Sequence, residues 1–271
     1  MRVGFFQFEV KHGDIKGNQR IIQDALLKEK FDLMVLPELF STGYLFDSKS
    51  ELRNYAETFS SSVTISILHD ICKKTKGCIV GTIPEFYEGE VYNTAIIVGP
   101  EGLLGAQQKI HLTTYEKDFF SPGSSIFTFK IKDAIIGVVT CFDLWFPEMS
   151  RLLTENKVDI IVCPSAFGGE ESLLLQRARV LENRIFSILC NQTGVQLSKK
   201  MKAKFRGESR IVSPEGKIMF SAEKGYCLHT EEIDLSMARK KYSILTENFG
   251  DEWKKYQISF NPMGLKMGTT D

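Results

Sequence analysis

Hydrophobic and polar positions follow two different periods along this chain of 271 residues. Short apolar runs rich in β-branched residues predict buried strands. They occupy residues 3–8, 33–36, 78–83, 92–98, 103–108, 127–131, 134–140, 160–164, 185–191, 209–212, 217–220 and 226–233. Apolar positions at helical spacing predict helices over 18–30, 63–74, 146–156 and 172–183. Strand and helix patterns therefore alternate, which is typical of an α/β protein.

Two turns of the same type interrupt this alternation. Gly99-Pro100-Glu101-Gly102 separates two predicted strands, and Ser213-Pro214-Glu215-Gly216 separates two others. Turn residues between apolar strands predict hairpins, and their recurrence suggests an internal two-fold repeat. Hairpins combined with strand–helix crossovers argue against a purely parallel sheet. They favour two packed sheets that are covered by helices.

The domain organisation is predicted from the absence of any Pro/Gly/Ser-rich linker. We expect one domain over residues 1–247. The segment 248–271 carries several aromatic residues, among them Trp253 and Tyr256. We expect it to form a C-terminal arm that packs on the domain or on a neighbouring subunit.

Composition narrows the function classes. A hydrophobic content of 43% supports a large core, and 34 basic residues balance 34 acidic ones. A protein that binds nucleic acid or an anionic membrane usually carries an excess of positive charge, so we expect neither partner here. Every apolar run is shorter than the roughly 20 residues of a membrane span. The N-terminus resembles a strand and not a signal peptide. We therefore expect a cytoplasmic protein.

The cysteine and histidine spacings do not match a metal site. None of the six cysteines forms a Cys-x-x-Cys pair, and only four histidines are present. We expect no metal and a reduced, intracellular protein.

Cys141 is the main candidate for chemistry. The apolar run before it stops at the thiol, and Pro147 and Glu148 then open a helical pattern. A helix N-terminus at this corner would favour the thiolate. Glu38 follows another strand, over 33–36, and the carboxyl ends of strands in α/β sheets collect functional groups. The two residues are therefore candidates for one pocket, although each one alone would more often be structural.

A thiol nucleophile needs a base and a positive group for the oxyanion. His111 lies in a dense motif, Lys109-Ile110-His111-Leu112. A Cys–His hydrolase is therefore a legitimate hypothesis, but no Asn or Asp context supports it.

Four blocks of the sequence resemble the nitrilase superfamily, the carbon–nitrogen hydrolases. The blocks are Leu36-Pro37-Glu38-Leu39-Phe40-Ser41-Thr42-Gly43-Tyr44; Lys109-Ile110-His111-Leu112 with Glu116 and Phe120-Ser121-Pro122-Gly123; Cys141-Phe142-Asp143 with Phe146-Pro147-Glu148; and Arg177-Ala178-Arg179 with Glu182-Asn183. They occur in family order and at family-like spacings, and the resemblance extends from about residue 3 to 234. It implies an α-β-β-α four-layer sandwich with two packed mixed sheets.

The resemblance also implies a Glu-Lys-Cys triad. Glu38 would be the general base, Lys109 would stabilise the oxyanion together with the Phe142 N–H, and Cys141 would form a thioester. Glu116 would position the substrate and support the triad. A carboxylate and an ammonium beside a thiol can divide the proton transfers without a histidine. No metal or organic cofactor is implied.

Other residues of the motifs then take supporting roles. We expect His111 to be structural, and we expect Glu182 and Asn183 to brace the site. Asp143 and Glu148 are interpreted as favourable charges at the N-terminus of the helix that follows Cys141.

Substrate preference is predicted from the residues after the nucleophile. Leu144 and Trp145 stand where relatives that act on carboxylates often place arginine, so we expect an apolar wall and a small neutral amide. The residues expected to bind substrate are Tyr44, Phe142, Trp145, Ala166 and Phe167. Cys-Phe-Asp resembles the amidase branches more than the Cys-Trp-Glu of true nitrilases.

Alternatives remain open at this point. An N-carbamoyl amine or amino-acid amidohydrolase and an ω-amidase would use the same triad. A nitrile hydrolase, an acyltransferase and a non-catalytic scaffold are less well supported. We expect a homodimer or higher homo-oligomer that associates through the helices over 146–156 and 172–183.

Overall fold

The computed structural model describes residues 1–199 and 201–239. In it the chain forms two mixed six-stranded sheets. One sheet has the order β14-β1-β2-β3-β4-β5, and the other has the order β13-β12-β9-β8-β7-β6. The strands of the first are β1 (Arg2–Gln7), β2 (Leu33–Val35), β3 (Cys78–Tyr87), β4 (Glu90–Gly99), β5 (Gly102–Gln108) and β14 (Cys227–Glu232). Those of the second are β6 (Thr128–Ile131), β7 (Ala134–Val138), β8 (Ile160–Ser165), β9 (Phe186–Asn191), β12 (Arg210–Val212) and β13 (Ile218–Ser221).

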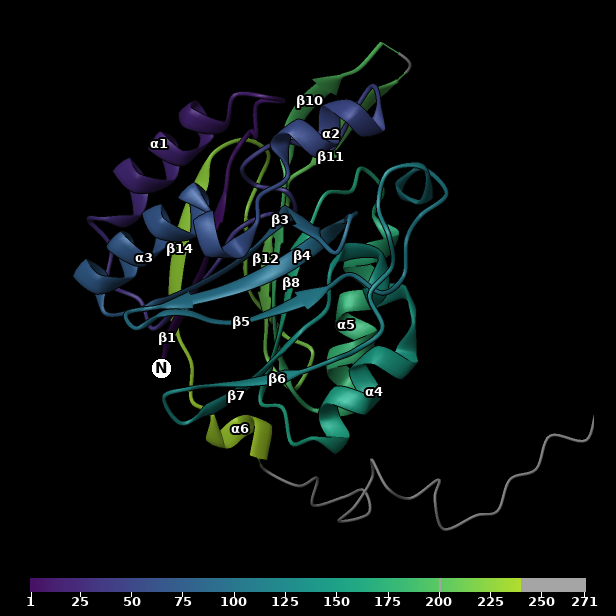
Figure 1. Ribbon diagram of the computed structural model, residues 1–271. Coiled ribbons are helices and arrows are strands. Elements are labelled where there is room, and N and C mark those ends of the chain that lie inside the picture. The colour runs from purple at the N-terminus through teal and green to yellow at the C-terminus, as the bar shows by residue number, and fades with distance from the viewer. Residues whose placement is uncertain (200, 240–271) are drawn as a thin grey trace, which may run out of the picture. The chain divides into compact units, whose positions relative to one another are not determined.

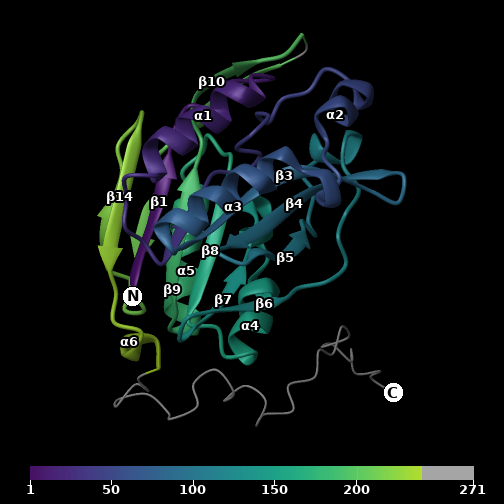
Figure 2. The ribbon, with the colours of Figure 1, turned by 60° about the vertical axis from the view of Figure 1, so that its left-hand side comes forward.

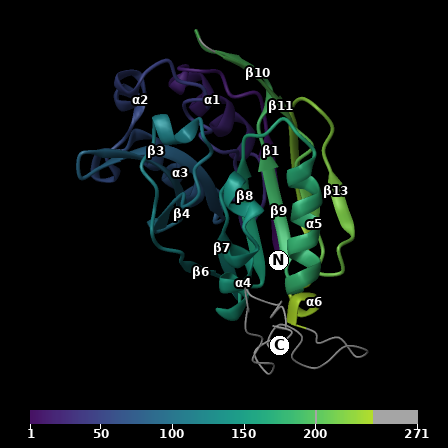
Figure 3. The same ribbon diagram turned by 90° about the vertical axis from the view of Figure 1, so that its right-hand side faces the viewer.

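Helices cover the outer face of each sheet (Figures 1 and 3). On one side lie α1 (Ile15–Leu26) and α3 (Val63–Thr75), which Figure 2 shows in front of the first sheet. On the other side lie α4 (Pro147–Glu155) and α5 (Glu171–Asn183). An apolar cluster that includes Val35, Val80, Val138 and Val162 fills the space between the sheets. Burial of both strand faces explains why these strands are continuously apolar. The predicted α-β-β-α sandwich is confirmed.

The strand pairing repeats between the two sheets. β1, β2 and β3 are parallel and are followed by the antiparallel β4 and β5. β7, β8 and β9 are parallel and are followed by the antiparallel β12 and β13. The two Pro-Glu-Gly turns connect β4 to β5 and β12 to β13, which are equivalent places. The topology therefore agrees with the predicted internal repeat.

This repeat places Glu38 beside the second sheet. Leu33 in β2 and Ile160 in β8 hold equivalent register positions, so Glu38 is equivalent to Ser165, five residues further along in each unit. The Glu38 N–H donates to the Ser165 carbonyl over 3.3 Å. The carboxyl ends of β2 and β8 therefore meet, and a residue that follows either strand faces the same region.

Several elements were not predicted. They are α2 (Lys49–Tyr55), α6 (Ser236–Arg239) and the two-stranded hairpin β10 (Thr193–Leu197) and β11 (Lys202–Arg206). Residues 240–247 of the predicted domain and the whole predicted arm, 248–271, lie outside the described residues. Among the helices that are described, none is both long and apolar enough to cross a membrane.

Candidate active site

Three of the four predicted catalytic residues follow the ends of different strands, and the fourth begins a short helix. Glu38 comes after β2, Lys109 directly follows β5, and Cys141 comes after β7. Glu116 begins the short 3-10 helix η2 (Glu116–Asp118). The side chains of Glu38, Lys109 and Glu116 are fully buried, and only 7% of Cys141 is exposed.

Lys109 joins the two glutamates. Its Nζ lies 2.7 Å from Glu38 Oε1 and 2.5 Å from Glu116 Oε1. Asn93 in β4 donates from Nδ2 to Glu38 Oε1 over 2.8 Å. The other oxygen, Glu38 Oε2, is buried and has no hydrogen-bond partner among the described residues. This leaves Oε2 for the Cys141 thiol, whose contact partly opposes the rise that burial causes in the pKa of Glu38.

The two carboxylates differ in protonation. Burial raises the pKa of Glu38 to about 7, although Lys109 opposes the shift. Burial would also raise the pKa of Glu116, but Lys109 and the hydrogen bonds from Thr113 lower it overall. Two neighbouring carboxyl groups with separated pKa values can divide proton transfer and charge stabilisation between them. Glu116 is thus the permanent anion, and Glu38 exchanges a proton near neutral pH.

The nucleophile turn holds Cys141 in an unusual backbone conformation. Cys141 begins the 3-10 helix η3 (Cys141–Trp145) with φ of 46°. A residue other than glycine pays strain energy in this left-handed region, and such strain concentrates at functional sites.

The expectation that a helix N-terminus favours the Cys141 thiolate is wrong. Burial and the negative charge of Glu38 raise the pKa of Cys141 well above its ordinary value, although Lys109 and the Ala166 N–H oppose them. Helix α4 begins only at Pro147. The resting thiol is therefore protonated at neutral pH.

Asp143 joins the nucleophile turn to the strand end that carries Lys109. Its Oδ1 accepts hydrogen bonds from the His111 backbone N–H over 2.7 Å and from the His111 ring Nδ1 over 2.8 Å. The ring stacks on Phe146 with centroids 3.6 Å apart. These contacts agree with the expected structural role of His111, which stays a prediction. Asp143 lies in the first turn of η3 and Glu148 in the first turn of α4, as expected of acidic residues at helix N-termini. Asp143 is also fully buried, and its hydrogen bonds to His111 give it a second role that was not expected.

Arg179 braces the same turn from α5. Its guanidinium donates to the carbonyls of Leu144 and Trp145, each over 3.2 Å. Glu182 pairs with Arg179, and Asn183 Nδ2 donates to the Arg179 carbonyl. Glu182 and Asn183 thus hold Arg179 in place and do not contact η3 themselves in these bonds. The direct contact of Arg179 with η3 was not predicted from the sequence.

Tyr44 and Ala166 lie close to the buried cluster. Burial and the charge of Glu116 raise the pKa of Tyr44 well above its ordinary value, and the charge of Lys109 opposes the rise. The Tyr44 ring packs on Tyr115 and, edge-on, on Phe205 of β11 at 5.9 Å. Phe205 was not identified from the sequence, where it appears only as one apolar residue between charged ones.

The other predicted substrate contacts are less central. Phe142 and Phe167 are half-buried, and Phe142 packs on Trp145. Trp145 is 44% exposed, and its indole Nε1 donates to Ser172 on α5. Leu144 belongs to the apolar cluster between the second sheet and its helices, so the prediction that it forms a wall of the pocket is wrong. Because Leu144 packs under the helices, it cannot support the prediction of a neutral amide substrate as an apolar wall of the pocket.

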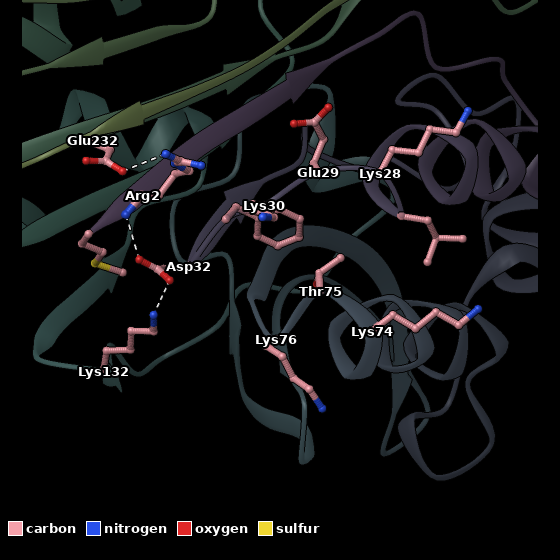
Figure 4. Close-up of a pocket in the computed structure, with 13 residues that line it drawn as sticks. Arg2, Lys28, Glu29, Lys30, Asp32, Lys74, Thr75, Lys76, Lys132 and Glu232 are labelled. Atoms are coloured by element: carbon pink, nitrogen blue, oxygen red, sulfur yellow. Dashed lines mark hydrogen bonds and ion pairs between the residues drawn. The ribbon is translucent and has the colours of Figure 1, made fainter.

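A recess of about 700 Å³ lies at the amino ends of the parallel strands β1 and β2, away from the carboxyl ends that Glu38 and Cys141 follow (Figure 4). Its basic lining residues are Arg2, Lys28, Lys30, Lys74, Lys76 and Lys132. Arg2 pairs with Glu232, and Lys132 pairs with Asp32. Lys28, Lys74 and Lys76 point in different directions and do not converge on one ligand position. We assign no binding function to this recess.

In the described ranges, no group of three or more His, Cys, Asp or Glu residues is placed to hold a metal ion.

Comparisons with known proteins show which sequences and folds this chain resembles. The family model for carbon-nitrogen hydrolases matches residues 2–241. A nitrilase from Pyrococcus abyssi is 33% identical over 88% of this chain and 90% of its own. The omega-amidase NIT3 of Saccharomyces cerevisiae is 31% identical over 78% of each chain. The crystal structure of yeast Nit3 superposes with a TM-score of 0.77 at 28% identity, and the match covers 88% of this chain and 92% of that one.

Proposed function

The chain belongs to the carbon–nitrogen hydrolase family, and we propose that it hydrolyses a small neutral amide through a thioester on Cys141. Relatives named amidase, omega-amidase and nitrilase support the general reaction, which is hydrolysis of carbon–nitrogen bonds in non-peptide amides. The observation that carries the detailed proposal is the buried Glu38–Lys109–Glu116 cluster beside the only slightly exposed Cys141 thiol.

In the first half-reaction the Cys141 sulfur attacks the amide carbon, and Glu38 accepts the thiol proton. A base with a pKa of about 7 is matched to this task at neutral pH. The developing oxyanion is stabilised by the Lys109 ammonium and the Phe142 N–H. Glu38 returns the proton to the leaving nitrogen, the carbon–nitrogen bond breaks, and ammonia departs from the thioester.

In the second half-reaction Glu38 takes a proton from water, whose oxygen attacks the thioester carbon. The carbon–sulfur bond breaks, the carboxylic acid leaves, and the thiolate recovers its proton from Glu38. Glu116 stays ionised throughout, which keeps Lys109 charged and oriented.

The charge of the cluster supports a neutral substrate. Two carboxylates face a single ammonium, and Lys109 already pairs with both of them. The Tyr44 and Phe205 rings border this region without adding positive charge. A substrate carboxylate placed here would be desolvated without a new cation to pair with it.

An amide panel tests the proposal. Ammonia release is measured for aliphatic and aromatic amides, an ω-amido acid and an N-carbamoyl amino acid, with carbon dioxide recorded in parallel. We expect the highest kcat/KM for a neutral amide and no carbon dioxide. A strong preference for the ω-amido acid would move the substrate class to that of the omega-amidase relatives. Absence of an acyl adduct on Cys141 with every reactive amide or ester would refute the thioester mechanism.

We also propose that two copies associate through the α4–α5 face. Leu174 and Leu181 on α5 are 64% and 42% exposed, and Leu152 on α4 is 46% exposed. Exposed leucines on two adjacent helices are typical of interaction surfaces. Sedimentation at micromolar concentration is expected to show a dimer that L174K shifts toward the monomer. A monomeric wild-type protein would contradict the assignment.

A further inference from the structure

Gln196 points inward from a hairpin strand whose neighbouring side chains point outward. In β10, Val195 and Leu197 are 41% and 64% exposed, whereas Gln196 is 3% exposed. Side chains alternate between the two faces of a strand, so Gln196 is directed into the protein from a mostly polar ribbon. A buried amide must find hydrogen-bond partners for both its oxygen and its nitrogen.

Three of the four side-chain hydrogen bonds of Gln196 are made to segments far away in the sequence. Its Oε1 accepts from the backbone N–H of Tyr44 over 2.8 Å and of Leu45 over 3.3 Å. Its Nε2 donates to the Val10 carbonyl over 2.9 Å and to Gln192 Oε1 over 2.7 Å. The amide thus uses two acceptor positions and two donors, which is its usual full capacity.

The Tyr44 segment is shaped around this amide. Gly43 has φ of +87°, and a Cβ at that position would lie only 3.1 Å from Gln196 Oε1. The side chain of Gln192, which is fully buried, continues the connection by donating to the Glu38 carbonyl over 2.6 Å. One hydrogen-bonded relay therefore joins the turn that carries Glu38 to the turn that carries Tyr44.

The Tyr44 hydroxyl has no hydrogen bond of its own within the described part of the chain, although the charges of Glu116 and Lys109 act on it. A hydroxyl beside the reacting groups that is not used by the protein is available to a substrate. Its position depends on the backbone at Tyr44, and Gln196 holds that backbone.

We propose that Gln196 is a positioning residue for substrate binding, which acts by holding Tyr44 so that its hydroxyl contacts the amide substrate. This inference rests on the proposed amide-hydrolase function. Gln196 does not touch the reacting atoms, so its loss raises KM more than it lowers kcat. The same loss has no further effect once the Tyr44 hydroxyl is absent, because the two residues then act as one unit.

The test compares Gln196→Met, Tyr44→Phe and the double variant, with the outward-facing Leu197→Thr as the matched control. For the best neutral amide, Q196M and Y44F are each expected to raise KM about tenfold, as expected when hydrogen bonds to a buried site are lost. The double variant should match Y44F alone, and L197T should match the wild type. Independent, multiplying effects of Q196M and Y44F would overturn the proposal, as would a Q196M defect confined to kcat.

Two further measurements cover other outcomes. Gln196→Glu keeps the acceptor for the Tyr44 and Leu45 N–H groups, so its KM should lie closer to the wild-type value than that of Q196M. Amide hydrogen exchange of residues 43–46 should be faster in Q196M than in L197T. If the wild type hydrolyses no amide of the panel, the proposed function fails, and the exchange result still decides the Gln196 contact. Equal exchange in both variants would refute it.

Discussion

The pH dependence of kcat/KM tests the assignment of Glu38 as general base. Burial raises the pKa of this carboxyl from 4.5 to about 7, so its proton is lost near neutral pH and not in the acid range. In the proposed mechanism, only the ionised form of Glu38 accepts the Cys141 proton. Activity should therefore be lost as the pH falls through about 7, and it should be retained above that value.

The expected size of the effect follows from the titration curve. With a pKa of about 7, the ionised fraction of Glu38 rises from about 9% at pH 6 to about 91% at pH 8, which is about a tenfold gain in kcat/KM. With the ordinary value of 4.5, the gain over the same interval would be only about 3%. No decline is expected at moderately alkaline pH, because the pKa values of Cys141 and Lys109 are both raised well above their ordinary values.

The assay is initial-rate ammonia release at saturating and subsaturating amide between pH 5.5 and 9, in buffers of constant ionic strength. Asn93→Ala provides a perturbation of known sign. It removes a hydrogen bond of 2.8 Å to Glu38 Oε1 that favours the carboxylate, so the acid limb should move to higher pH. A flat profile between pH 6 and 8 would refute the reasoning, and so would a shift to lower pH in N93A.

Further predictions concern the other residues of the site and can be checked separately. Cys141→Ala should abolish turnover while thermal melting stays cooperative, and residual turnover would exclude the thioester route. Arg179→Met should lower kcat/KM by about tenfold, because a buried and a partly buried carbonyl of η3 lose their donor; unchanged kinetics would show that η3 keeps its conformation without Arg179. The raised pKa of Glu38 means that the folded state keeps a proton which the unfolded state has lost, so the free energy of unfolding should fall by about 3 kcal/mol between pH 4.5 and 7. Chemical denaturation should show this slope in the wild type and a smaller one in Glu38→Gln, and equal slopes would contradict the buried-carboxyl account.

Local pattern predicted the layers of the fold and the catalytic candidates. Strands such as β2 and β8 are buried on both faces, so they are apolar throughout and can be recognised without tertiary information. The equivalent Pro-Glu-Gly turns indicated the repeat that the topology shows. The proximity of Glu38 to Cys141 followed from the rule that sites collect at the carboxyl ends of strands.

The hairpin β10–β11 could not be identified in the same way. Its outer face carries Val195 and Leu197 together with lysines, and its inner face carries Gln196 beside one buried aromatic residue, Phe205. The usual contrast between an apolar core face and a polar outer face is therefore weak. Gln196 resembles any polar surface residue until the strand direction and the distant Tyr44 segment are known.

The sequence by itself determined which residues could do chemistry, because motif spacing and strand-end position depend on local order along the chain. Only the tertiary structure decided the pKa values of these residues and the hydrogen bonds that hold them in place. The Cys141 thiol is protonated at rest and Glu38 titrates near pH 7 because burial and neighbouring charges from four separate elements act together. Leu144 faces the helices, and Asp143 binds His111 across the turn, because side-chain direction after a strand depends on the 3-10 geometry of η3. Desolvation and Coulomb interactions depend on distances in space, and residues as far apart as Glu38 and Gln192 acquire those distances only on folding.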